Sequence, residues 1–182
     1  LRCADGVRVV DLLNDFERDR SGGYILPDLL SGSPLNIVVR LEVSGELLDG
    51  KLIDVDLNYT DQESGSTESV SLPFLAEFDT KEAIEALETN LEVQEAVVLL
   101  MNARARREAM EHIDEGDISA ALFCVAAPRQ EAARLYSKTG SKALKDEIDD
   151  LESVNELLTN REDDLMARKR LAYRRESTRK GK

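Results

Sequence analysis

The period of the hydrophobic residues changes once along the 182-residue chain, near residue 79. Between Val7 and Phe78 apolar residues alternate with polar ones, and Gly, Ser, Pro and Asp fill the breaks, a pattern typical of strands and turns. Beyond Asp79 the apolar residues recur at the three- and four-residue spacing of amphipathic helices. The sequence therefore predicts an α+β chain with a β region at 1–78 and a helical region at 79–182.

The β region is predicted to contain five strands, near residues 7–13, 23–29, 35–44, 51–60 and 67–78. The clearest is the fourth, where Ile53, Val55 and Leu57 alternate with Asp54 and Asp56, as in an antiparallel strand that is buried on one face. A polar loop at 61–67 would turn the chain into the fifth strand. Five strands separated by turns predict a small antiparallel β-sandwich or a half-barrel, and we favour the sandwich.

The helical region is predicted to open with an α-helical hairpin at about 80–136. Asp79, followed three residues later by Glu82, forms a capping-box pattern at the start of the first helix. Gly116 is expected to end that helix and Asp117 to cap the next one. Pro128 is expected at a kink or in the first turn of a third short segment, because proline disrupts a helix interior.

A long C-terminal helix is predicted at about 142–176, followed by a basic tail. Such a helix would be roughly 50 Å long, too long for one small core to cover, so it should dock antiparallel on the first helix or pair with another chain. Docking would bring its basic end towards the acidic residues near 82–88. We predict a protein-interaction role for the apolar stripe and basic end, namely Leu151, Leu158, Leu165, Arg168, Arg170 and Arg174.

The distribution of charge excludes some partners. The chain has 37 acidic and 24 basic residues, a net charge of −13, yet residues 161–182 carry nine basic and four acidic side chains. The acidic body would repel phosphates, and Tyr173 is the tail's one aromatic residue, so we expect no nucleic-acid partner. No run approaches 18 apolar residues, so we expect no membrane segment.

No set of residues with catalytic or metal-binding spacing stands out. Asp54, Asp56 and Asn58 imitate the start of a calcium loop, but Tyr59 and Gly65 occupy the positions that require Gly and Glu. We therefore assign these three residues to the solvent-exposed face of a strand. The sequence holds no nucleophile elbow and no phosphate-binding loop, so we predict that the chain is not an enzyme and has no catalytic, cofactor-binding or metal-binding residues.

The lone histidine and the two cysteines have structural interpretations. His112 lies among glutamates on a helix, where a hydrogen-bonded or exposed role is favoured over metal binding. Cys124, between Phe123 and Val125, is expected to be a buried, unreactive side chain. Two cysteines fit a reducing compartment, and we predict a cytoplasmic location.

An ordered set of motifs resembles a known family. The motifs are the runs Asn90–Val97 and Met101–Ala109, then Gly116-Asp117 and Ala121, preceded by the strands Val38–Val43 and Val55–Asp61 and followed by Asp164–Tyr173. Together they resemble the sandwich, helical hairpin and C-terminal end of bacterial von Willebrand factor type A domain proteins.

This resemblance implies a non-enzymatic accessory region that supports a metal-dependent ligand-binding domain. The Asp-x-Ser-x-Ser loop that holds a divalent metal in that family does not occur in this chain, so the metal and its domain would lie upstream of Leu1. The implied partners are proteins, either that upstream domain or another copy of the chain. The alternative is a free-standing helical scaffold or oligomerisation module, supported by the hairpin and the long apolar stripe.

Overall fold

The computed structural model describes residues 1–29, 32, 34–44, 50–77, 82, 86–160 and 164–180, apart from the side chains of residues 160, 164 and 165. The chain forms two compact units. The β unit comprises residues 1–12, 16–25 and 39–88, and the helical unit comprises residues 13–15, 26–38 and 89–182. The α+β class, with strands preceding helices, is confirmed. Neither unit is contiguous in sequence, whereas the prediction placed a single boundary near residue 79.

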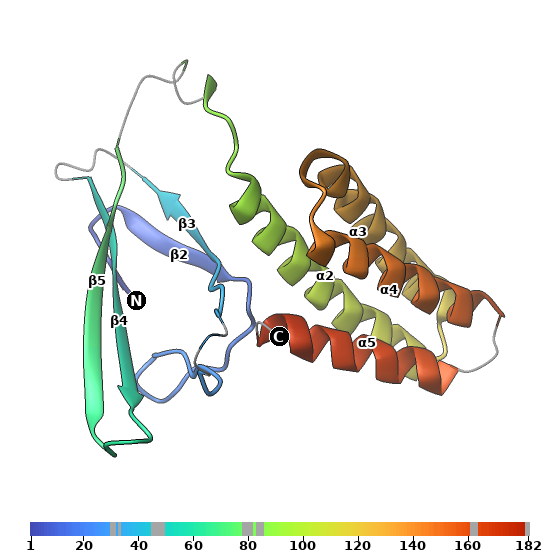
Figure 1. Cartoon of the computed structure of the whole chain (residues 1–182), viewed down its shortest axis with the longest axis horizontal. Coiled ribbons are helices and arrows are strands. Elements are labelled where there is room, and N and C mark those ends of the chain that lie inside the picture. Colours follow the sequence, from blue (N-terminus) through green and yellow to red (C-terminus); the bar gives the residue numbers. More distant parts are fainter. Residues whose placement is uncertain are drawn as a thin grey trace. The chain divides into compact units, whose positions relative to one another are not determined.

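Two small antiparallel sheets make up the β unit (Figure 1). One has the strand order β1-β4-β5 and contains β1 (Arg2–Cys3), β4 (Lys51–Thr60) and β5 (Thr67–Leu75). The other pairs β2 (Val7–Leu12) with β3 (Val39–Val43). The longest pairing joins β4 to β5, from Lys51 opposite Leu75 to Thr60 opposite Thr67, so these two strands form a long hairpin.

The predicted polar loop closes this hairpin. The Asp61 carboxylate accepts the backbone N–H of Glu63 at 2.7 Å, and the backbone N–H of Gly65 donates to the Asp61 carbonyl at 2.8 Å. Gly65 has φ +68°, a conformation that glycine adopts without steric cost. The backbone N–H of Asp61 then donates to the Ser66 carbonyl at 2.9 Å, which starts the return strand.

The strand predicted at 23–29 is wrong, because the described backbone there forms only an isolated bridge between Arg18 and Tyr24. The Asp19 carboxylate accepts the backbone N–H groups of Ser21 and Gly23, which favours a turn. The strand predicted at 35–44 covers only Val39–Val43, and β5 ends at Leu75. The two-residue strand β1 was missed because it is too short to show a hydrophobic period.

The first long helix, α2 (Leu91–Asp114), begins at an asparagine cap. The side chain of Asn90 accepts the backbone N–H groups of Glu92 at 2.9 Å and Val93 at 3.1 Å, which satisfies two of the free donors at a helix start. The predicted capping box depends on Asp79, which lies outside the described residues.

The junction between α2 and α3 (Ile118–Thr139) confirms the predicted hairpin. Gly116 has φ +78°, and the backbone N–H groups of Gly116 and Asp117 donate to the carbonyls of Ile113 and His112, the pairing of a Schellman motif. The Asp117 carboxylate then accepts the backbone N–H of Ala120 at 2.9 Å, so the same residue starts α3. Pro128 lies inside α3, so the predicted third segment is wrong; the helix runs on to Gly140.

The stretch predicted as one helix at 142–176 contains two described helices, α4 (Lys142–Asn160) and α5 (Asp164–Arg179). In a straight helix Asp150 and Arg170 would lie about 30 Å apart, because each residue adds 1.5 Å. Their side chains instead meet, with Nε of Arg170 2.8 Å from Oδ1 of Asp150. The chain therefore folds back between α4 and α5, at a point where residues 159–164 are all polar.

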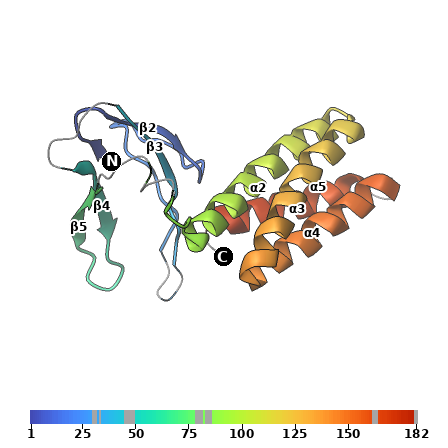
Figure 2. The same ribbon diagram turned by 90° about the horizontal axis from the view of Figure 1, so that it is seen from above.

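The four described helices pack as a bundle, shown from above in Figure 2. Helix α2 packs on α3 and α5, and α4 packs mainly on α3. The core of the bundle contains side chains with almost no exposed surface, among them Ala109, Ala121, Val125, Leu151, Val154, Leu158 and Leu171. Among the described helices, none combines the length and the apolar character that crossing a bilayer requires.

Candidate functional site

A cluster of charged side chains lies inside the bundle, where α2, α4 and α5 meet. We call it the buried charge cluster. Arg106 is 0% exposed and Glu147 is 1% exposed. Nη2 of Arg106 lies 2.7 Å from Oε1 of Glu147, and Nδ2 of Asn102 donates to the same oxygen at 3.0 Å. This carboxylate is therefore held by two residues of α2.

The second carboxylate of the buried charge cluster, Asp150, contacts three guanidinium groups. The distances to its oxygens are 3.4 Å from Arg106 Nη2, 2.8 Å from Arg170 Nε and 3.5 Å from Arg174 Nε. Arg174 also lies 3.9 Å from Glu147. Three positive groups thus surround two negative ones, and the cluster ties α4 and α5 to α2.

This arrangement suits a structural role better than a catalytic one. Both carboxylates already accept bonds from fixed donors, and breaking a buried pair by removing one partner costs about 3–5 kcal/mol. Among the described residues, Nε and Nη1 of Arg106 have no hydrogen-bond partner although they are buried. The cluster therefore fixes the register of the helices at some cost in desolvation.

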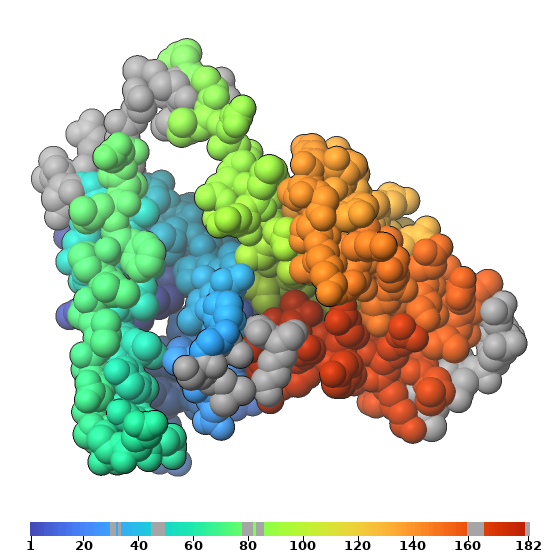
Figure 3. Space-filling view, viewed as in Figure 1, coloured from blue at the N-terminus to red at the C-terminus, as the bar shows by residue number. Residues whose placement is uncertain are grey.

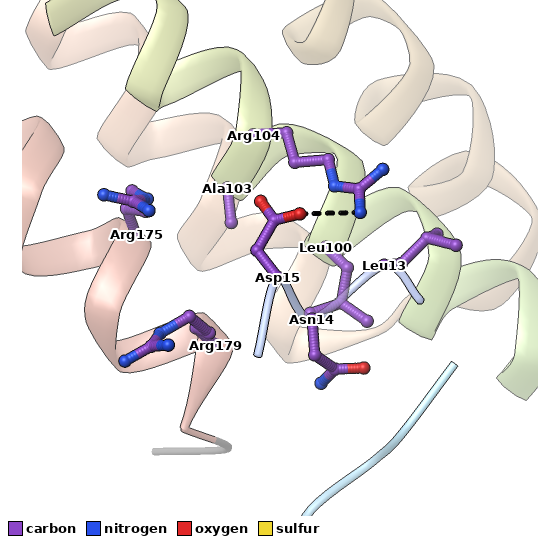
Figure 4. A pocket seen from close by; sticks show the side chains of 8 residues that line it. All are labelled: Leu13, Asn14, Asp15, Leu100, Ala103, Arg104, Arg175 and Arg179. Carbon is purple, nitrogen blue, oxygen red and sulfur yellow. Dashed lines mark ion pairs between the residues drawn. The ribbon is translucent and has the colours of Figure 1, made fainter. Parts of the chain in front are cut away.

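A shallow pocket in the helical unit has a basic lining (Figure 4). Asp15 lies at its centre and has φ +53°, which is unusual for a residue other than glycine. Its carboxylate lies 2.7 Å from Arg104 Nη2 and 2.9 Å from Arg107 Nη1. From α5, Arg175 and Arg179 also line the pocket. The acidic side chain already occupies the position an anion would take, so we assign the pocket no ligand.

Asn14, beside this pocket, fixes the segment that carries Asp15. It is 1% exposed, its Nδ2 donates to the carbonyl of Asn36 at 2.8 Å, and its Oδ1 accepts the backbone N–H of Val38 at 3.0 Å. A buried side-chain amide that satisfies two backbone groups is a strong constraint on the chain. Residues 13–15 and 36–38 are thereby held together within the helical unit.

The β4–β5 hairpin carries exposed apolar side chains along β5. All nine residues of β5 are exposed. The exposed fractions are 42% for Val70, 55% for Leu72 and 52% for Phe74, whereas Leu151 and Leu158 of α4 are each 1% exposed. Val70, Leu72 and Phe74 point to one face because they alternate along a strand. We call these three side chains the β5 apolar face.

The six residues predicted to mediate protein interaction lie as follows. Leu151 and Leu158 are buried in the bundle core. Arg170 and Arg174 belong to the buried charge cluster. Arg168 pairs with Asp114, and the side chain of Leu165 lies outside the described part. In this structure the five described side chains make contacts within the chain.

The Arg168–Asp114 pair joins α5 to the C-terminal end of α2. Nη2 of Arg168 donates to Oδ2 of Asp114 at 2.9 Å. This hydrogen bond lowers the pKa of Asp114 below its usual value and raises the pKa of Arg168. Sequence reasoning placed Arg168 near residues 82–88, at the opposite end of the first helix. That placement is wrong because the chain reverses between α4 and α5.

Other candidate residues have ordinary partners. On β4, Asp54 lies 2.8 Å from Lys51 Nζ, and Asp56 lies 2.9 Å from Arg2 Nε. A hydrogen bond from Ser71, and then Arg2, lowers the pKa of Asp56. Burial raises the pKa of Cys124, which disfavours its reactive thiolate form. Within the described ranges, no three His, Cys, Asp or Glu side chains are grouped so that they could hold a metal ion.

Sequence reasoning missed the buried charge cluster and the Asp15 pocket. Their residues stand far apart in the chain, 44 positions between Arg106 and Asp150 and 92 between Asp15 and Arg107. One local signal could have indicated the cluster. The three- and four-residue spacing of the helices places Arg106 and Glu147 on the same helix faces as apolar residues. Comparison with protein-family models, with curated proteins and with solved structures gives no significant match.

Proposed function

We propose that this chain is a non-enzymatic accessory region of a von Willebrand factor type A domain protein. In this role it supports an upstream, metal-dependent ligand-binding domain, or transmits the effect of ligand binding by that domain, and it binds protein partners. The ordered resemblance of its motifs to that family supports the assignment. The observation that carries the interaction role is the β5 apolar face.

The exposed side chains of β5 distinguish this strand from an ordinary surface strand. A solvated strand normally directs apolar residues inward and polar residues outward. Here Leu72 and Phe74 are more than half exposed, and Val70 on the same face is 42% exposed. Contiguous exposed apolar side chains are typical of surfaces that bind other proteins.

The helical unit fits this role because it is well packed in itself. Its core is closed by side chains such as Leu144 and Leu171, which are 0% exposed, and its helices are joined by the buried charge cluster. An accessory region needs a well-packed unit but no reactive group.

The alternative function is a free-standing helical scaffold or oligomerisation module. Phe123 and Tyr173 favour it, because these aromatic side chains of α3 and α5 are 78% and 73% exposed. Against it, the leucine stripe that would form an intermolecular seam, Leu151 and Leu158, is buried within the chain. Sedimentation equilibrium separates the two, since an oligomerisation module must associate by itself.

The test of the proposed function begins with the gene segment that encodes the residues before Leu1. An Asp-x-Ser-x-Ser loop there is expected. The encoded upstream domain is then titrated with the purified chain by calorimetry in Mg²⁺, where we expect saturable binding. A Leu72→Lys/Phe74→Lys variant should bind more weakly, while the matched control Asn58→Lys, on the polar face of β4, should bind normally. No such loop, or no binding, would overturn the proposal.

A further inference from the structure

The β5 strand has an unpaired edge. In its sheet β5 pairs with β4 on one side, and among the described residues no strand pairs with it on the other. In the space-filling view β5 is visible along its whole length (Figure 3). Such an edge displays a row of free N–H and C=O groups, which is a template for another strand.

Two hydrogen bonds show which residues face the free edge. The carbonyl of Ser66 accepts from Asp61, and the backbone N–H of Ala76 donates to Gly50, so even-numbered residues of this segment bond towards β4. Backbone groups alternate in direction along an antiparallel strand, and β5 contains no bulge of its own. The odd-numbered residues from Thr67 to Leu75 therefore present their N–H and C=O groups outward, except for Pro73, which has no N–H.

The β5 apolar face lies directly beside this row of backbone groups. An added strand would bond to residues 67, 69 and 71 and would place alternate side chains next to Val70 and Leu72. Main-chain bonds supply affinity in this mode of recognition, and alternate side chains supply specificity. The edge and the face thus form one binding surface.

The charge of the β4–β5 hairpin indicates which kind of strand would bind to its free edge. Residues 51–77 contain one basic residue, Lys51, and six acidic residues: Asp54, Asp56, Asp61, Glu63, Glu68 and Glu77. Even with Arg2 of β1, which pairs with Asp56, this sheet keeps a net negative charge. A second copy of this hairpin would bring like charges together, which disfavours pairing. A strand with Lys or Arg between its apolar residues would meet opposite charge.

We propose that the free edge of β5 binds an extended, basic segment of a partner protein as an added antiparallel or parallel strand. Apolar side chains of that segment pack on the β5 apolar face, and its basic side chains lie on the opposite face of the hairpin, the face that carries Asp54 and Asp56. The inference rests on the proposed function and names the chemistry of the partner.

The test uses the whole chain and three labelled nine-residue peptides, read by fluorescence anisotropy. In the first peptide Val alternates with Lys, in the second Val alternates with Glu, and the third is the Lys peptide with every second amide N-methylated. The Lys peptide should bind. The Glu peptide and the N-methylated peptide should each bind at least about tenfold more weakly, because one loses charge complementarity and the other loses main-chain bonds.

Two variants of the chain locate the site. Ser69→Pro removes an outward N–H without touching the bonds to β4 and should weaken binding of the Lys peptide about tenfold, while Ser69→Ala should leave it unchanged. Circular dichroism checks that the fold is kept. If Ser69→Pro does not fold, Leu72→Lys, which changes only an exposed side chain, replaces it and should weaken binding similarly.

Four outcomes would overturn the inference. Equal binding of the N-methylated peptide would show simple charge attraction. Equal binding by Ser69→Pro and Ser69→Ala would place the peptide elsewhere. A dimer of the chain that Ser69→Pro abolishes would make a second copy the occupant. If no peptide binds but the upstream domain still does, only this inference fails; if the upstream domain does not bind, the proposed function fails even where the Lys peptide binds.

Discussion

The two units of this chain use their apolar residues differently. In the helical unit, Leu144, Val154 and Leu171 have no exposed surface. In the β unit, the described buried apolar side chains are Val7, Leu12, Phe16 and Ile53, and each keeps 5–8% exposure. The β unit also leaves large side chains such as Leu72 more than half exposed.

The difference follows from geometry. Four amphipathic helices can surround a common core and leave no backbone edge, because each helix satisfies its own hydrogen bonds. Small sheets of two and three strands cover little area and keep edges. The helical unit is therefore expected to supply most of the stability, and the β unit most of the surface available to partners.

The largest effect is expected from Leu151→Asp/Leu158→Asp. The two leucines are each 1% exposed, and burying two carboxylates in their place should remove more than about 5 kcal/mol from the free energy of unfolding. Urea denaturation followed by the helical circular dichroism signal measures it. Leu87→Asp, at a site 73% exposed, is the control and should change little. If the double variant unfolded at the same urea concentration as the parent protein but no longer formed an oligomer, the leucine stripe would join different chains.

A smaller loss is expected when the buried charge cluster is broken. Arg106→Met should lower the free energy of unfolding by about 3–5 kcal/mol, because Glu147 keeps its charge but loses its closest cation. Adding Glu147→Met should recover part of that loss, since the second change removes the stranded charge. The same urea titrations give both values. A double variant less stable than the sum of the two single changes would contradict the account.

Asp15 provides a test of backbone strain. Asp15→Ala should cost about 1–2 kcal/mol, because it removes the contacts with Arg104 and Arg107, while the strain of a Cβ at φ +53° stays as it is in the parent protein. Asp15→Gly removes the same contacts but relieves the strain, so it should cost less by about 1 kcal/mol. Thermal unfolding of the two variants measures the difference. Equal stability would mean that the backbone relaxes at this position.

The stability of the helical unit should also depend on pH through Glu176. Hydrogen bonds from Arg179, then from Lys180, lower the pKa of Glu176 from 4.5 to about 2. A lowered pKa favours the folded state when the group is ionised, so the contribution is full above pH 4.5 and is lost as the pH falls towards 2. Because this side chain is 43% exposed, the contribution should be less than about 1 kcal/mol. Glu176→Gln should abolish this pH-dependent part of the free energy of unfolding. If the free energy of unfolding of the parent protein and of the variant changed with pH in the same way, the assignment to Glu176 would be contradicted.

The smallest effect is expected in the β unit. Leu72→Ser should change the free energy of unfolding by no more than about 0.5 kcal/mol, because the side chain is already 55% exposed. Ile53→Ala, on the paired strand and 5% exposed, is the contrast and should cost about 2 kcal/mol or more. If Leu72→Ser were as costly as Ile53→Ala, the β5 apolar face would be part of a core.

Local patterns predicted the elements whose causes are local. Gly116 and Asp117 end one helix and begin the next through bonds that span at most five residues. The alternation at Ile53, Val55 and Leu57 likewise predicted β4. Each of these features depends on residues that the sequence places side by side.

The features that sequence reasoning missed depend on distant residues. The spacing of Leu151, Leu158 and Leu165 predicted an apolar stripe, but a stripe does not specify which helix covers it or where the chain reverses. The salt bridge of Arg106 with Glu147 joins residues 41 positions apart. The exposure of Leu72 could not be predicted either. The alternation of apolar and polar residues indicates which side chains share a face of the sheet, but not whether another part of the protein covers that face.

The interleaving of the two units has a consequence for synthesis on the ribosome. Asp15 and Asn14 leave the ribosome early, but the arginines that Asp15 contacts follow about 90 residues later. At roughly 5–20 residues per second, the segment waits on the order of 5–20 seconds for its partners. Strands β2 and β3 flank residues that cannot reach their final contacts until α2 exists. The segment that carries Asp15 is thus fixed only after α2 has been made, although the strands on either side of it emerge much earlier.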